Sequence, residues 1–167
     1  MQIFHCLNRT KNLTGGLTLL VDGMAAAHAL KHEYPDAYDI LSSIAIETEY
    51  QEILKHYLAK NPLIVTDPVS NDILQIRFNL YDRAPMRTIQ SSESIRKYYR
   101  ALCDLTNIIL SDRFLLKMKL EPGTVLIIDN WRVLHGRTAF KGQRHMCGSY
   151  IARSDWISMA RTMGLLL

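Results

Sequence analysis

The sequence has few cysteines, and their spacing does not indicate a common disulfide or metal site. Cys6, Cys103 and Cys147 are the only three in 167 residues, and none belongs to a Cys-x-x-Cys motif. An odd, widely spaced set argues against both a disulfide framework and a structural zinc site built on cysteine. We therefore expect a reducing compartment.

Long hydrophobic runs are also missing. The longest apolar stretches, 63–65 and 125–128, are far shorter than the roughly 20 residues of a membrane-spanning helix. The first seven residues lead at once into a polar turn at 8–12, which is unlike a secretory signal peptide. The sequence predicts neither a membrane partner nor an N-terminal signal peptide.

The excess of positive charge is small. Lys and Arg number 20 against 16 Asp and Glu, which gives a net charge of +4. The basic residues are scattered and no aromatic residues are interleaved with a basic run, so we expect no nucleic-acid partner. An anionic small-molecule substrate explains the surplus equally well.

Hydrophobic residues make up 48% of the chain and charged residues 22%, as in a single packed globular domain. The pattern predicts strands over 2–7 and 17–21, joined as a hairpin or as a strand-loop-strand unit. A helix over 24–31 follows, with Asp22-Gly23 as its N-cap. Two short helices are expected within 36–60, although 44–48 also fits a strand.

The rest of the chain favours strands around one long helix. Helical spacing extends over 91–114, with Ser91 or Ser92 as the N-cap. Ser154-Asp155 would cap a last helix over 156–163. Strands are predicted over 63–66, 73–79, 124–129, 132–136 and 146–152. Many short strands with inserted helices indicate a mainly β (α+β) jelly roll or barrel rather than a doubly wound sheet.

The densest run of chemically useful residues is 129–137. His135 precedes a glycine at the predicted end of a strand, where an imidazole can enter the mouth of a barrel while the backbone turns away. That position suits a metal ligand, and the alternative is a surface or hydrogen-bonded core histidine. Asp129, Trp131 and Arg132 are expected to be structural, supporting the loop that presents His135.

Residues 122–137, together with Phe140, Gly142, Arg144, Cys147, Gly148 and Tyr150, closely resemble the C-terminal catalytic half of the trimethyllysine and γ-butyrobetaine dioxygenases. Segments 2–7, 15–16, 19–23 and 77–84 are similar to the same family. The trimethyllysine branch is the closer match, and the resemblance covers nearly the whole chain.

The resemblance implies a double-stranded β-helix that holds iron(II) through a His-x-Asp motif and one distal histidine. His135 matches the distal ligand. Arg144 matches a clamp for a 2-oxoglutarate carboxylate, the alternative being a solvated arginine beside His145. Tyr150 matches an aromatic residue facing the trimethylammonium group, the alternative being a core tyrosine. Asn79 falls on a strand that lines the substrate pocket.

No His-x-Asp or His-x-Glu occurs in the sequence, so only one of the family's three iron ligands is present. We therefore expect 1–167 to be the C-terminal part of the catalytic domain, shortened on its N-terminal side, with an incomplete β-helix and no activity alone.

The implied reaction is hydroxylation of trimethyllysine in carnitine synthesis, with 2-oxoglutarate as co-substrate, Fe(II) as cofactor and ascorbate as an expected addition. The location would be mitochondrial for the trimethyllysine type and cytoplasmic otherwise. The alternatives are a γ-butyrobetaine hydroxylase, or a non-catalytic module that forms homo-oligomers or pairs with a full-length homologue through open strand edges.

Overall fold

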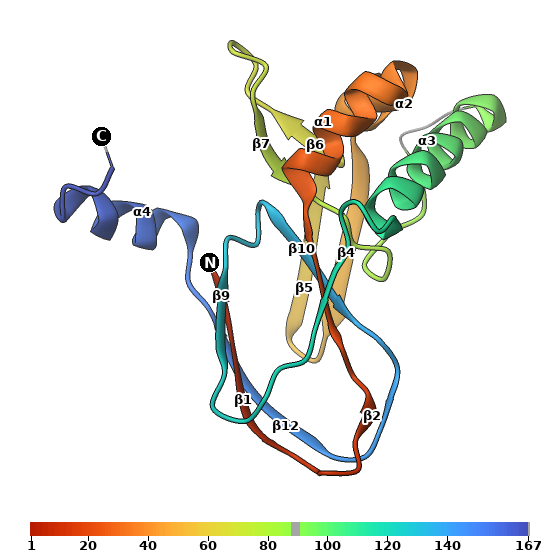
Figure 1. Cartoon of the computed structure of the whole chain (residues 1–167). Coiled ribbons are helices and arrows are strands. Elements are labelled where there is room, and N and C mark those ends of the chain that lie inside the picture. Colours follow the sequence, from red (N-terminus) through yellow and green to blue (C-terminus); the bar gives the residue numbers. More distant parts are fainter. Residues whose placement is uncertain (88–90, 167) are drawn as a thin grey trace. The chain divides into compact units, whose positions relative to one another are not determined.

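The computed structural model describes residues 1–87 and 91–166 (Figure 1). The chain divides into two compact units, one formed by 1–20 with 116–167 and the other by 21–115. The inserted helices build a core of their own in the second unit. No helix in the described part of the chain is long and apolar enough to cross a membrane.

The first unit is built around the antiparallel sheet β12-β1-β9. Its central strand is β1 (Gln2–Arg9), flanked by β9 (Val125–Ile128) and β12 (Arg144–Tyr150). Gln2 lies opposite both Ile128 and Tyr150, and a bulge between Cys6 and Asn8 shifts the register of β12. Residues 2–7 and 125–128 therefore form strands as expected, and they pair although they lie more than a hundred positions apart in the sequence.

A second sheet joins β10 (Val133–Arg137), β3 (Thr18–Asp22) and β8 (Leu116–Met118) in that order. Two short strands, β2 (Thr14–Gly15) and β11 (Phe140–Lys141), pair beside it. The hairpin alternative for the first two strands is wrong. β1 and β3 belong to different sheets, because the loop between them already pairs with β11.

Helix α4 (Arg153–Thr162) follows β12, and Ala152 rather than Ser154 or Asp155 is its N-cap residue. The expected cap is wrong because the backbone becomes helical at Arg153, which leaves Ser154 and Asp155 inside the first turn. Arg153 donates to both carboxylate oxygens of Asp129, at 3.0 and 2.9 Å. This contact ties the helix to the end of β9.

The second unit carries helices α1 (Gly23–Glu33), α2 (Pro35–Ser43) and α3 (Ser92–Leu110). The Asp22 carboxylate accepts from the backbone N–H of Met24 and Ala25, both at 3.2 Å, which confirms the predicted cap of α1. Ser91 is the cap of α3, since its hydroxyl accepts from the N–H of Ser94 at 3.0 Å. α3 ends at Leu110 and not at Phe114.

The three helices bury their apolar faces against one another, and α2 also packs on β6 (Ile64–Thr66) and α1 on β7 (Ile73–Ile76). β6 and β7 pair antiparallel, and β7 is shorter than the predicted strand over 73–79. The largest fully buried side chains of this core are Leu30, Leu41, Ile64, Tyr98 and Leu105. Most of these core side chains come from helices, in agreement with the helices that the sequence predicts within this part of the chain.

The helix predicted around residues 50–58 is wrong. Strands β4 (Ile46–Glu52) and β5 (Lys55–Asn61) form an antiparallel hairpin there. Tyr50 and Tyr57 lie opposite each other with stacked rings 6.4 Å apart. Apolar residues on both sides of a two-residue turn at Ile53-Leu54 imitate helical spacing, although both residues are exposed.

The described residues form several sheets of two or three strands and close no barrel. The mixed content of strands and inserted helices agrees with the predicted fold class.

Candidate active site

His135 lies in the middle of β10, and its neighbour Gly136 continues the strand. The prediction that the backbone turns away at this glycine is wrong, because β10 runs on to Arg137, and Gly136 is not among the glycines with a left-handed backbone. The Phe4 ring meets the His135 ring edge-on, with centroids 5.2 Å apart. An edge strand of the second sheet and an aromatic neighbour thus hold the imidazole.

The turn before β10 is organised by Asp129, as expected for a structural residue. Its side chain accepts from the backbone N–H of Trp131 at 3.0 Å, and its carbonyl accepts from that of Val133 at 2.7 Å. Asp129 also holds Arg153, whose guanidinium lies 4.7 Å from the Trp131 ring centroid. These contacts set the direction in which β10 leaves the turn towards His135.

Arg144 begins β12 and is half-buried. Its Nη1 donates to the carbonyl oxygen of Gly16 at 3.4 Å, which is near the limit of a hydrogen bond. Most of its five N–H donors therefore stay available for a ligand. The alternative of a fully solvated arginine does not match this position.

His135 and Arg144 line one cavity of about 430 Å³ within the first unit. Its other lining residues are Phe4, Thr18, Leu120, Gly136, Arg137 and Met146. No acidic residue is among them, while two arginines and a histidine are, so the lining favours an anionic ligand. Sequence reasoning missed Thr18, whose only signal was a hydroxyl within the apolar strand 17–21.

Tyr150 does not line this cavity. It is 72% exposed, and its hydroxyl accepts a hydrogen bond from the buried Gln2 amide at 2.9 Å. The alternative of a core tyrosine is therefore wrong. Tyr150 lies on the same face of β12 as Arg144, because alternate residues of a strand share a face. Six positions of about 3.3 Å each separate the two residues along the strand.

Asn79 lies in the second unit. Its side-chain amide donates to Asp82 at 2.6 Å, and its side-chain carbonyl accepts from the N–H of Tyr81 at 2.9 Å. Both contacts stabilise a turn after β7. The structure thus brings together His135 and Arg144 of the four predicted site residues, while Tyr150 and Asn79 lie outside their cavity.

His135 is exposed as a whole residue, as the surface alternative has it, yet partial desolvation of its ring lowers the pKa of the imidazole, and a backbone hydrogen bond at Val133 offsets part of this effect. In a ¹H–¹³C NMR titration we expect the His135 ring to titrate below the ordinary value of 6.5. The neutral imidazole, which is the metal-binding form, then persists to more acidic pH. Because the unfolded chain takes up this proton first, stability falls as the pH drops from 6.5 through the lower folded value.

The missing signal in His135→Gln would assign the resonance. A midpoint at or above the ordinary histidine value would show that the packing on Phe4 leaves this imidazole well hydrated, and would contradict the expectation.

No group of three or more His, Cys, Asp or Glu side chains that could hold a metal ion occurs among residues 1–87 and 91–166. A facial triad needs two histidines and one carboxylate. Within the described residues the cavity therefore offers one ligand, His135, and does not form a complete iron site.

Two relatives are similar over most of the chain. The mitochondrial trimethyllysine dioxygenase of Gallus gallus is 40% identical over 169 residues, covering 99% of this chain and 40% of the relative. The γ-butyrobetaine dioxygenase of Pseudomonas sp. (strain AK-1) is 34% identical over 161 residues, covering 95% of this chain and 41% of the relative. The chain thus spans about two fifths of the length of these relatives.

Among solved structures, the fold is similar to that of PvcB, an Fe, alpha-ketoglutarate dependent oxygenase from an isonitrile synthetic pathway. The match has a TM-score of 0.63 and 20% identity, and covers 92% of this chain and 52% of that one. The family model for taurine catabolism dioxygenases matches residues 1–150. On this match the chain belongs to the taurine catabolism dioxygenase TauD, TfdA family.

Proposed function

We propose that this chain forms the co-substrate side of the active site of an Fe(II)- and 2-oxoglutarate-dependent dioxygenase that hydroxylates trimethyllysine in carnitine synthesis. The observation that carries the proposal is the single cavity lined by His135, Thr18 and Arg144. In the proposed reaction O₂ is the oxidant: one of its oxygen atoms enters the substrate as a hydroxyl group, and the other enters 2-oxoglutarate, which loses CO₂ to give succinate.

Arg144 is the proposed clamp for the distal carboxylate of 2-oxoglutarate. A guanidinium offers two parallel donors in a plane, which matches a carboxylate better than the point charge of lysine does. The Thr18 hydroxyl lies in the same cavity and is the proposed second donor. The absence of acidic residues from the lining supports a dianionic co-substrate.

His135 is the proposed iron ligand from this chain. Because the described residues supply one of three ligands, we derive no step through the metal, and the remaining two would have to come from a His-x-Asp motif that this sequence lacks. Ascorbate is proposed as the reductant that keeps iron in the Fe(II) state.

Tyr150 is proposed to face the trimethylammonium group of the substrate. A quaternary ammonium has no hydrogen to donate, so an aromatic face is its natural partner, contributing about 0.5–2 kcal/mol. The open ring of Tyr150, with its hydroxyl held by Gln2, supports this role. Asn79 is the second proposed substrate contact, carried over from the resemblance alone.

Higher identity to the trimethyllysine dioxygenase than to the γ-butyrobetaine enzyme, 40% against 34%, favours trimethyllysine as substrate and a mitochondrial location. The γ-butyrobetaine reaction, with a cytoplasmic location, is the alternative. A further candidate is a non-catalytic module that self-associates or pairs with a full-length homologue. The outer strands β9 and β12, unpaired on one side in the described residues, favour it.

The test compares the 167-residue chain with a longer version that carries a His-x-Asp motif ahead of Met1. With Fe(II), 2-oxoglutarate and ascorbate, the longer version should yield hydroxylated trimethyllysine and succinate by mass spectrometry. The 167-residue chain should yield neither, because a lone histidine leaves Fe(II) mostly bound to water.

Two results would count against this proposal. Turnover by the 167-residue chain above an iron-free control would show that its iron site is completed by other residues. A longer version that hydroxylates γ-butyrobetaine in preference to trimethyllysine would select the alternative substrate.

A further inference from the structure

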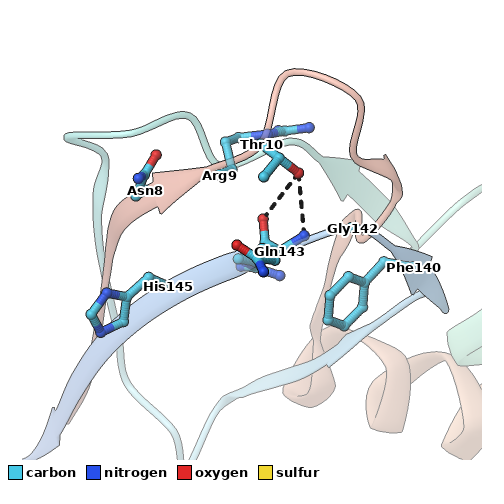
Figure 2. A pocket seen from close by; sticks show the side chains of 8 residues that line it. Asn8, Arg9, Thr10, Phe140, Gly142, Gln143 and His145 are labelled. Atoms are coloured by element: carbon cyan, nitrogen blue, oxygen red, sulfur yellow. Dashed lines mark hydrogen bonds between the residues drawn. The ribbon is translucent and has the colours of Figure 1, made fainter.

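A second cavity, of about 500 Å³, lies beside the first one at the start of β12, and Arg144 lines both. Figure 2 shows its lining side chains coming from the end of β1 on one side and from the β11–β12 segment on the other. The Thr10 hydroxyl bridges these two sides, because it accepts from the N–H of Gln143 at 3.2 Å and donates to its carbonyl at 3.4 Å. The two segments on either side of the cavity are thus hydrogen-bonded to each other.

Two arginines on neighbouring strands line this cavity. Arg9 and Arg144 are direct partners in the antiparallel register of β1 and β12, so their side chains lie on one face of the sheet. Like charges at directly opposite positions repel each other. Arg9 is also only 10% exposed, so water screens its charge poorly. Such a pair is stable where an anion lies between the two guanidinium groups.

Contacts within the chain offset only part of the charge of this pair. Arg9 approaches the carbonyl oxygen of Leu120 at 3.5 Å and a carboxylate oxygen of Glu121 at 3.7 Å, both long for hydrogen bonds. Glu121 is closer to Lys119, at 2.9 Å. A hydrogen bond from Lys119 is also the main cause that lowers the pKa of Glu121, with Arg9 the weakest. No acidic residue lines the cavity itself.

Two guanidinium forks with spare donors suit a ligand that carries two carboxylates. Each fork can bind one carboxylate through parallel N–H donors, and the Asn8 and Gln143 amides add polar lining. We propose that Arg9 and Arg144 hold a small dicarboxylate dianion in this second cavity, next to the co-substrate cavity. The choice of ligand class rests on the proposed function, whose co-substrate and product are both dicarboxylates.

Isothermal titration of the 167-residue chain with succinate tests the site. We expect Arg9→Gln to weaken succinate binding by about tenfold or more, because one of the two charged forks is lost. Arg161→Gln, the same change on the exposed face of α4, should leave the constant unchanged. Inorganic phosphate serves as a second probe and should bind more weakly than succinate, because its charge is concentrated at one centre.

An unchanged succinate constant in Arg9→Gln, or phosphate binding as tight as that of succinate, overturns the proposal. If Arg9→Gln loses the far-UV circular dichroism of the parent chain, Arg9→Lys decides. It retains the charge without the fork and should bind succinate at an intermediate strength. No weakening in a folded Arg9→Lys would likewise contradict the site.

Thr18→Val separates this inference from the proposed function, because Thr18 lines the first cavity and not the second. It should weaken 2-oxoglutarate binding and leave the dependence of succinate on Arg9 intact. The 2-oxoglutarate constant could instead be unchanged in Thr18→Val while Arg9→Gln still weakens succinate binding. That result would contradict the co-substrate assignment and support the second site.

Discussion

Replacing Arg144 by Lys is expected to weaken the binding of 2-oxoglutarate to the 167-residue chain by roughly ten- to a hundredfold. The variant retains the positive charge but loses one of two parallel charge-assisted hydrogen bonds, a loss of about 1.5–3 kcal/mol. Isothermal titration with 2-oxoglutarate measures the effect. Arg161→Lys, on exposed α4, is the matched control and should bind like the parent chain.

An unchanged 2-oxoglutarate constant in Arg144→Lys would contradict the assignment of Arg144 as the carboxylate clamp. It would leave Arg137 as the other arginine that lines the same cavity. Arg137 lies 4.3 Å from the Phe140 ring centroid, so its guanidinium already has an aromatic partner.

The second large effect concerns stability. Leu105→Ala is expected to lower the free energy of unfolding of the helical unit by about 2–5 kcal/mol, because it removes a fully buried side chain of α3 and leaves a cavity. Urea unfolding followed by far-UV circular dichroism should show a lower midpoint. Leu110→Ala lies on the same helix at a 57% exposed position, and its effect should stay within about 0.5 kcal/mol.

Equal midpoints for Leu105→Ala and Leu110→Ala would mean that α3 does not pack as described. Because α3 contacts both α1 and α2, such a result would also call into question the core of the whole unit.

Local sequence signals were enough to predict the elements that begin with a side-chain N-cap or in which apolar residues recur at a regular spacing. Asp22 and Ser91 each sit one residue before a helix and bond to its first N–H groups. The hairpin at 46–61 was not predicted. Its apolar turn lies between strands that also carry apolar residues, and together these residues recur at the three- and four-residue spacing of a helix. The partner of β1 could not be predicted either, since its pairing with β12 joins residues 148 positions apart, such as Gln2 and Tyr150.

The resemblance indicated His135 and Arg144, and the structure places both at one cavity. The position of Tyr150 outside that cavity could not be predicted from the sequence. The alternation of residues along a strand shows which face of the sheet a side chain is on, but not how far it lies from a pocket. Thr18 went unnoticed for a related reason. Thr18 comes close to His135 only because β3 pairs with β10, and no local sequence pattern predicts this long-range pairing.

Arg153 lies between the two tryptophans of the chain, 4.7 Å from the Trp131 ring centroid and 5.2 Å from that of Trp156. The tryptophan fluorescence of this protein therefore originates at one place, the junction of α4 with the turn before β10. A change in emission reports whether that junction is closed. Melting of the helices α1 to α3 would be silent in the tryptophan signal, so an optical assay of that unit has to follow its own tyrosines, such as the buried Tyr98.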